Sequence, residues 1–105
     1  MSRIVTDELF EQEVVYADHP ILVDVWAAWC MPCKAVVREL DLLEHKYLDL
    51  DVVKIDADNS PMLLKDYGIM SLPTLMYFAP GESPKSIVGA AAASVIEEKF
   101  GLSNG

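Results

Sequence analysis

Apolar residues recur along the chain with two spacings, one typical of helices and the other of buried strands. Helical spacing predicts a first helix over residues 7–17 and a long second helix that starts near Cys30. Between them, the almost unbroken apolar run Ile21–Ala27 predicts a strand buried on both faces. Asp24 is the exception in that run, because its carboxylate has to leave water to lie there.

Strands and helices continue to alternate in the second half of the chain. The turn residues Pro80–Ser83 separate two strand-like runs and predict an antiparallel hairpin. Ser94 and Glu97 have the spacing of a capping box and predict the start of a last helix, which Gly101 ends. Further strands are predicted at residues 50–56, 74–79 and 85–88, and a short helix at residues 62–67.

This order of elements predicts an α/β fold, a mixed sheet with helices on both faces. The chain has 105 residues, of which 52% are hydrophobic, enough for one core and therefore for a single domain over residues 1–105. Working sites of such sheets lie beyond the carboxyl ends of the parallel strands. The turn from Trp26 to Cys30 is at one such end.

Charge and hydropathy exclude several classes of function. A net charge of -9, with eight scattered Lys and Arg residues, argues against nucleic acid as a partner. Residues 1–15 are acidic where a signal peptide would have an apolar core, and no apolar run approaches the roughly 18 residues of a membrane span. We therefore expect a soluble, cytoplasmic protein that does not bind membranes.

The two cysteines, Cys30 and Cys33, are separated by two residues. A reducing cytosol makes a structural disulfide improbable, which leaves redox chemistry, metal ligation or an accidental pair. A zinc site needs roughly four ligands, and the other soft candidates, His19 and His45, do not have the spacing of such a site. We expect no bound metal.

Thiol exchange needs an attacking thiolate and a second thiol that resolves the mixed disulfide. At a helix start Cys30 meets unpaired N–H groups and the positive end of the dipole, worth about 0.3 to 1 kcal/mol and up to ~2 when partly buried. That energy lowers a thiol pKa from about 8.5 toward about 7. We expect Cys30 to be exposed and to attack, and Cys33 to be more buried and to act second. Pro32 stiffens the turn without losing a hydrogen bond.

The segment Val23–Lys34 resembles the active-site segment of the thioredoxin family. The resemblance continues in the same order through nearly the whole chain. It implies the thioredoxin fold, a central mixed sheet of about five strands flanked by about four helices. The matching segments are Val53–Asp56, Tyr67–Ile69, Leu72–Thr74 and Val88–Ala90.

Carried over by position, the resemblance makes Cys30 the attacking thiolate and Cys33 the resolving thiol. It also makes Asp24 the buried carboxylate that helps to move the Cys33 proton. Burial supports that role, since it raises the pKa of a carboxyl toward neutrality; the alternative is a structural Asp24 paired with a neighbour. Lys54 matches the family's lysine near that aspartate and is expected to pair with it.

The resemblance also implies a docking surface around the cysteines. Pro73 matches a proline that the family holds in the cis form. The backbone of Leu72 is expected to offer strand-like hydrogen bonds to an extended substrate. The apolar rim expected around the site consists of Trp29, Met31, Pro32, Leu72, Gly89 and Ala90.

Met31 stands where the family commonly has glycine, and it leaves the redox potential and the partner set open. The leading hypothesis is a monomeric dithiol reductase of protein disulfides that a separate thioredoxin-reductase-type donor recycles, with no bound cofactor. Two alternatives remain, a disulfide oxidase or isomerase and a thioredoxin-fold interaction module whose cysteines are incidental.

Overall fold

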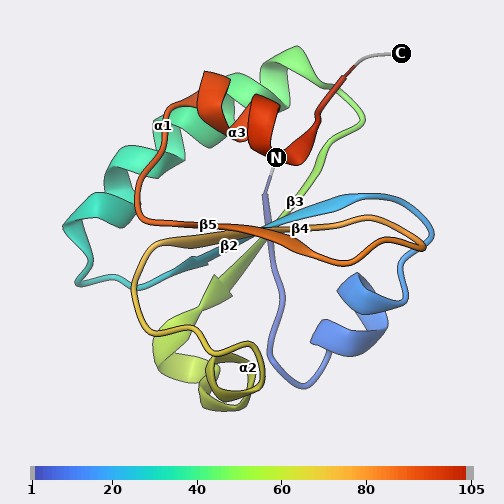
Figure 1. The fold of residues 1–105 in the computed structure, drawn as a ribbon. Coiled ribbons are helices and arrows are strands. Elements are labelled where there is room, and N and C mark those ends of the chain that lie inside the picture. The colour runs from blue at the N-terminus through green and yellow to red at the C-terminus, as the bar shows by residue number, and fades with distance from the viewer. Residues whose placement is uncertain (1, 104–105) are drawn as a thin grey trace.

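The computed structural model describes residues 2–103, so Met1, Asn104 and Gly105 of the predicted domain lie outside it. Five strands form one mixed sheet in the order β1-β3-β2-β4-β5 (Figure 1). The strands are β1 Arg3–Ile4, β2 Ile21–Trp26, β3 Asp51–Asp56, β4 Thr74–Phe78 and β5 Lys85–Val88. The helices are α1 Met31–Lys46, α2 Pro61–Asp66 and α3 Ala93–Phe100, with a π-helix η1 Glu11–Val15 and a 3-10 helix η2 Ala57–Asn59.

Strand β2 is central, parallel to β3 and antiparallel to β4. Helices α1 and α3 cover one face of the sheet, and α2 and η1 cover the other (Figure 1). Alternate β2 residues therefore enter different cores: Val23 packs on the α2 side and Leu22 on the α1 side. The unbroken apolar run is explained by this burial on both faces, and the predicted α/β fold is confirmed.

The first predicted helix, residues 7–17, is wrong in length and type. Only Glu11–Val15 is regular, and the Tyr16 N–H donates to the Glu11 carbonyl five residues back, as in a π-helix. The apolar spacing was nevertheless informative, because Phe10 and Val14 are both buried. Strand β1 was not predicted, since two residues are too few to show a period.

The capping box predicted for Ser94 and Glu97 does not form, and no side-chain hydrogen bond of the cap residue closes the start of α3. Instead the Ala93 N–H donates to Glu39 Oε1 at 2.9 Å. Glu97 accepts a hydrogen bond from Lys46 Nζ at 2.7 Å, and this charged partner on α1 holds the carboxylate away from its own helix start. Tertiary partners thus replaced a local cap.

The predicted strands and the short helix agree with the structure to within a residue at each end, the long helix begins at Met31 beside the predicted Cys30, and the hairpin forms as expected. None of the helices within residues 2–103 is long and apolar enough to cross a membrane.

Candidate active site

The cysteine pair lies where β2 ends and α1 begins. Cys30 is the N-cap residue of α1, with extended backbone angles, and its N–H donates to the Ala27 carbonyl at 3.1 Å. Pro32 lies in the first turn of α1 and is exposed, where a proline sacrifices no helical hydrogen bond. The turn before α1, the segment before β4 and the segment after β5 lie on the same side of the molecule (Figure 1).

Cys30 and Cys33 form a disulfide with a Cα–Cα distance of 5.4 Å. The Cys33 N–H donates to Cys30 Sγ at 3.2 Å, so the Cys30 sulfur acts as the side-chain cap of the helix. In the dithiol form a Cys30 thiolate at this position accepts the same hydrogen bond, now with a full negative charge. The helix start therefore supplies the Cys30 sulfur with a backbone hydrogen-bond donor.

The expected difference in exposure between the two cysteines is wrong. Cys30 is 4% exposed and Cys33 is 3% exposed. Both cysteines belong to the core cluster on the α2 side of the sheet, and the disulfide joins their sulfurs there. The helix cap distinguishes the two cysteines, and exposure does not.

Asp24 lies in the middle of β2 and is fully buried. Within residues 2–103 neither of its carboxylate oxygens has a hydrogen-bond partner. Removal from water raises the pKa of Asp24 to about 6, and the positive charge of Lys54 offsets part of that rise. A structural aspartate, the alternative role, would be hydrogen-bonded to a neighbour, and Asp24 has no such neighbour among the described residues.

Lys54 is directly opposite Asp24 in the β2–β3 ladder, as expected, but it does not form the expected close pair. Its Nζ lies 5.6 Å from the ring centroid of Trp26, and no ion pair within 4 Å joins it to Asp24. The face of the Trp26 ring attracts the Lys54 ammonium group. The charges of Lys54 and Asp24 therefore interact at a distance, without a direct ion pair. A cavity of about 140 Å³ lies next to the Lys54 side chain. It is lined by Trp26, Ala27, Ala28, Cys33, Lys34, Val37 and Lys54.

The Leu72–Pro73 peptide bond is cis, as the resemblance implied. The Pro73 carbonyl accepts a hydrogen bond from the Gly89 N–H at 2.8 Å. Gly89 has φ +94°, a value that favours glycine, so this contact depends on the residue type. The hydrogen bond places Gly89 and its exposed neighbour Ala90 beside the proline turn, and Leu72 is half-buried there.

Large apolar side chains stand exposed around the cysteines. Trp29 is 68% and Met31 is 70% exposed, and the Trp29 indole N–H donates to both oxygens of Asp58, at 3.0 and 3.1 Å. Sequence reasoning missed Asp58, which is 29 residues away, and also the exposed Met70 and Val88. A signal existed for the last two, because Val88 is the first residue of a segment that matched the family and Met70 lies between two such segments.

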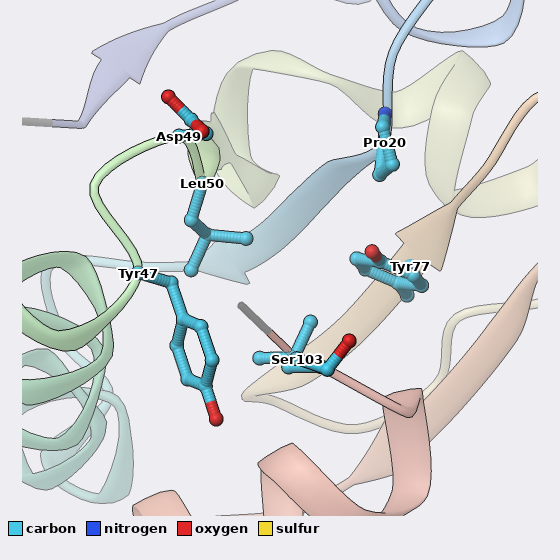
Figure 2. Close-up of a pocket in the computed structure, with 7 residues that line it drawn as sticks. Pro20, Tyr47, Asp49, Leu50, Tyr77 and Ser103 are labelled. Carbon is cyan, nitrogen blue, oxygen red and sulfur yellow. The ribbon is translucent and has the colours of Figure 1, made fainter. Parts of the chain in front are cut away.

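A further cavity of about 180 Å³ lies at the opposite end of the sheet (Figure 2). Pro20 precedes β2 and Leu50 precedes β3, so this cavity is at the amino ends of the parallel strands. Its lining contains no cysteine, and the chemistry of the pair does not reach it. Within residues 2–103 no group of three or more His, Cys, Asp or Glu side chains is arranged to hold a metal ion.

Comparison with known proteins identifies the family. Residues 1–100 match the family model for thioredoxin. The chain belongs to the thioredoxin family. It is 45% identical to a thioredoxin of Porphyra purpurea over 94 residues, covering 89% of this chain and 88% of the other. It is 42% identical to thioredoxin 1 of Synechococcus elongatus over 97 residues, with 91% of each chain covered.

A solved structure gives the same result. The crystal structure of chloroplastic thioredoxin z superimposes with a TM-score of 0.83 at 31% identity, covering 95% of this chain and 91% of the other. Together with the Cys30–Cys33 pair at the start of α1, these relatives identify the chain as a thiol:disulfide oxidoreductase with the thioredoxin fold.

Proposed function

We propose that the protein works as a reductase of protein disulfides, with Cys30 as the attacking thiolate. Cys30 attacks one sulfur of a target disulfide, forms a mixed disulfide and releases the other sulfur as a thiolate. Cys33 then attacks Cys30, which frees the second target sulfur and leaves the Cys30–Cys33 disulfide. The hydrogen bond from the Cys33 N–H to Cys30 Sγ carries this assignment.

Asp24 accepts the proton that Cys33 must lose before its attack. With a pKa of about 6, its carboxyl is mostly ionised at pH 7 yet basic enough to take up a proton. Lys54 sets that pKa, because its positive charge opposes the effect of burial. Lys54 is therefore a positioning residue, and its effect reaches the sulfurs through Asp24.

The target docks as an extended segment against the turn that contains Leu72 and Pro73. The apolar side chains of Trp29 and Met31 contact it on one side. On the other side the target lies against the segment after β5 that contains Gly89. The hydrogen bond from the Gly89 N–H to the Pro73 carbonyl supports this placement, because it holds that segment beside the proline turn. The docking surface consists of Trp29, Met31, Pro32, Leu72, Gly89 and Ala90.

We assign residues 1–105 to one domain that works as a monomer. A thioredoxin-reductase-type donor reduces its oxidised form. We propose no nucleic acid and no membrane as a partner. Among compartments we propose the cytoplasm. The similar solved structure is named chloroplastic, so a plastid is the competing location. Cell fractionation with an antibody against the chain distinguishes the two.

The equilibrium redox potential of the pair, measured against glutathione, tests the direction of exchange. A value near about -270 mV supports a reductase, whereas one near about -120 to -180 mV would identify an oxidase or isomerase. The Cys30→Ser variant should not attack target disulfides. A double variant of both cysteines that keeps full biological activity would instead establish an interaction module.

A further inference from the structure

A hollow adjoins the docking surface on the side away from Trp29. It has a volume of about 320 Å³ and lies on the α2 side of the sheet, between the loop after α2 and strand β5. Thr74 and Met76 are on the β4 strand at its base. We call this hollow the side pocket, and its lining includes Met70, Thr74, Met76, Lys85, Ser86 and Val88.

The side pocket is continuous with the active-site face. Thr74 directly follows Pro73, and Val88 directly precedes Gly89, whose N–H is bonded to the Pro73 carbonyl. Thr74 and Val88 are also partners in the β4–β5 ladder. A target segment that pairs with the backbone before Pro73 therefore passes the mouth of the side pocket within a few residues, at roughly 3.3 Å per residue.

The side pocket is lined by the apolar side chains of Met70, Met76 and Val88 together with the polar Ser71, Ser86 and Lys85. It contains no Asp or Glu although the chain carries 17 of them, and its only charged residue is Lys85. Met70 is 95% exposed and Val88 is largely exposed, so both apolar side chains lack a cover. The Thr74 hydroxyl already donates to the Ser71 carbonyl at 2.7 Å, which leaves it without a free donor for a polar ligand.

We propose that the side pocket takes a bulky apolar side chain of the target protein, located two or three residues to one side of the cysteine that Cys30 attacks. This inference rests on the proposed reductase function and adds a preference to it. Met70 and Val88 are the specificity-determining residues, since burying them against the target removes apolar surface from water. The flexible thioether of Met70 adapts to aliphatic and aromatic side chains.

The test uses peptides that carry one cysteine in a mixed disulfide with 2-nitro-5-thiobenzoate. Attack of the prereduced protein on the peptide sulfur releases that coloured thiolate, the better leaving group, and its appearance gives the rate. Phe replaces Ala at one position at a time, from three residues before the cysteine to three after. We expect the Phe peptide to react about tenfold faster than the Ala peptide at positions on one side of the cysteine only.

Two variants alter the side pocket, and one is a matched control. Met70→Glu places a charge at the mouth, and Ser86→Phe fills the hollow from the exposed strand β5. Met62→Glu makes the same change at an exposed methionine of α2 that does not line the side pocket. The ratio of Phe to Ala rates should fall to about one in the first two variants and stay about tenfold in the control. Because the ratio is taken within each variant, the yield of folded protein does not affect it.

Equal rates for Phe and Ala peptides, or an acceleration on both sides of the cysteine, would overturn the side pocket while leaving the reductase function in place. A protein that reduces none of the peptides would overturn the proposed function as well. Self-association of the native chain that Met70→Glu abolishes, measured by sedimentation, would assign the side pocket to a second copy and overturn the proposal.

Discussion

Asp24 and Asp51 lie on neighbouring strands, and their surroundings are opposite. Asp24 is in the middle of β2, where no group of the described residues 2–103 hydrogen-bonds to its carboxylate, and burial raises its pKa to about 6. Asp51 begins β3 at the other end of the sheet, where Arg3 donates to it at 3.0 and 3.2 Å and His19 is bonded to it at 2.8 Å. The hydrogen bonds from Arg3 and His19 outweigh its burial and lower the pKa of Asp51.

The comparison separates a carboxylate that stabilises the fold from one that destabilises it. Asp51 joins β1, β3 and the loop before β2, and Arg3 extends the group to Glu13 on η1 at 3.1 Å. Folding removes the Asp24 carboxylate from water, so its negative charge lowers the stability of the folded protein. Buried groups with such a cost are common at functional sites, which supports the proton-transfer role that we propose for Asp24.

The largest expected effect is on stability, in Asp24→Asn. The change of the Asp24 pKa from its ordinary value of 3.8 to about 6 corresponds to about 3 kcal/mol of destabilisation at pH 7, at about 1.36 kcal/mol per pKa unit. The folded state holds the proton more tightly, so the native protein loses stability as the pH rises from about 4 to about 6.

Urea unfolding of the oxidised proteins checks this prediction. Asp24→Asn should be more stable than the native chain by up to about 3 kcal/mol at pH 7, less whatever the buried amide costs, and the gain should shrink below pH of about 4. A gain that is the same at both pH values would contradict the assignment of the effect to ionisation.

The same Asp24→Asn substitution should slow the step in which Cys33 attacks, by about 10² at pH 7, because the proton acceptor is lost. Acid quenching followed by mass spectrometry measures the decay of the mixed disulfide. The deficit should diminish at pH 9, where hydroxide removes the proton instead. Equal decay from pH 6 to pH 9 would exclude a role in proton transfer.

Asp51→Asn should have the opposite sign and destabilise the protein by about 1 kcal/mol at pH 7, since its partners are partly exposed. The pKa of Asp51 is lowered by folding, so its contribution is present above the unfolded pKa and is lost as the pH falls through the folded pKa. Asp41→Asn, at an exposed position of α1, removes the same charge and serves as the control. Equal losses of stability in Asp51→Asn and Asp41→Asn would show that Asp51 acts only through its charge and not through its hydrogen bonds to Arg3 and His19.

His19→Gln should have the smallest effect, below about 1 kcal/mol, because the ring is nearly half exposed. The side-chain hydrogen bonds to Asp18 and Asp51 raise the pKa of His19. The contribution of the charged ring is therefore fully present below the unfolded pKa of about 6.5 and is lost as the pH rises through the folded pKa. The difference in unfolding temperature between His19→Gln and the native protein should therefore be larger at pH 5 than at pH 9.

The active-site half of this comparison could be predicted from the sequence, and the Asp51 half could not. Asp24 stands out because one polar residue interrupts a local apolar run, and Cys30 and Cys33 are close neighbours in the chain. Asp51 depends on Arg3, which is 48 residues away and belongs to a strand of two residues. No short-range pattern records such a contact.

The same limit applies at the active site. The hydrogen bond between Trp29 and Asp58 and the place of Lys54 over the Trp26 ring follow from how β2, β3 and η2 are arranged in space. The lysine was identified from the family resemblance, but its nearest partner was not. Burial of Cys30 was also missed, because a helix cap and a disulfide act on the sulfur together.

The two edges of the sheet bear on how this protein behaves at high concentration. Edge strand β1 has two residues and edge strand β5 has four, so each presents only a short row of unpaired backbone groups. A long flat edge templates the addition of strands from other molecules, and short edges restrict it. The sheet is therefore poorly suited to growing into aggregates, even while its exposed apolar side chains stay available for transient contacts.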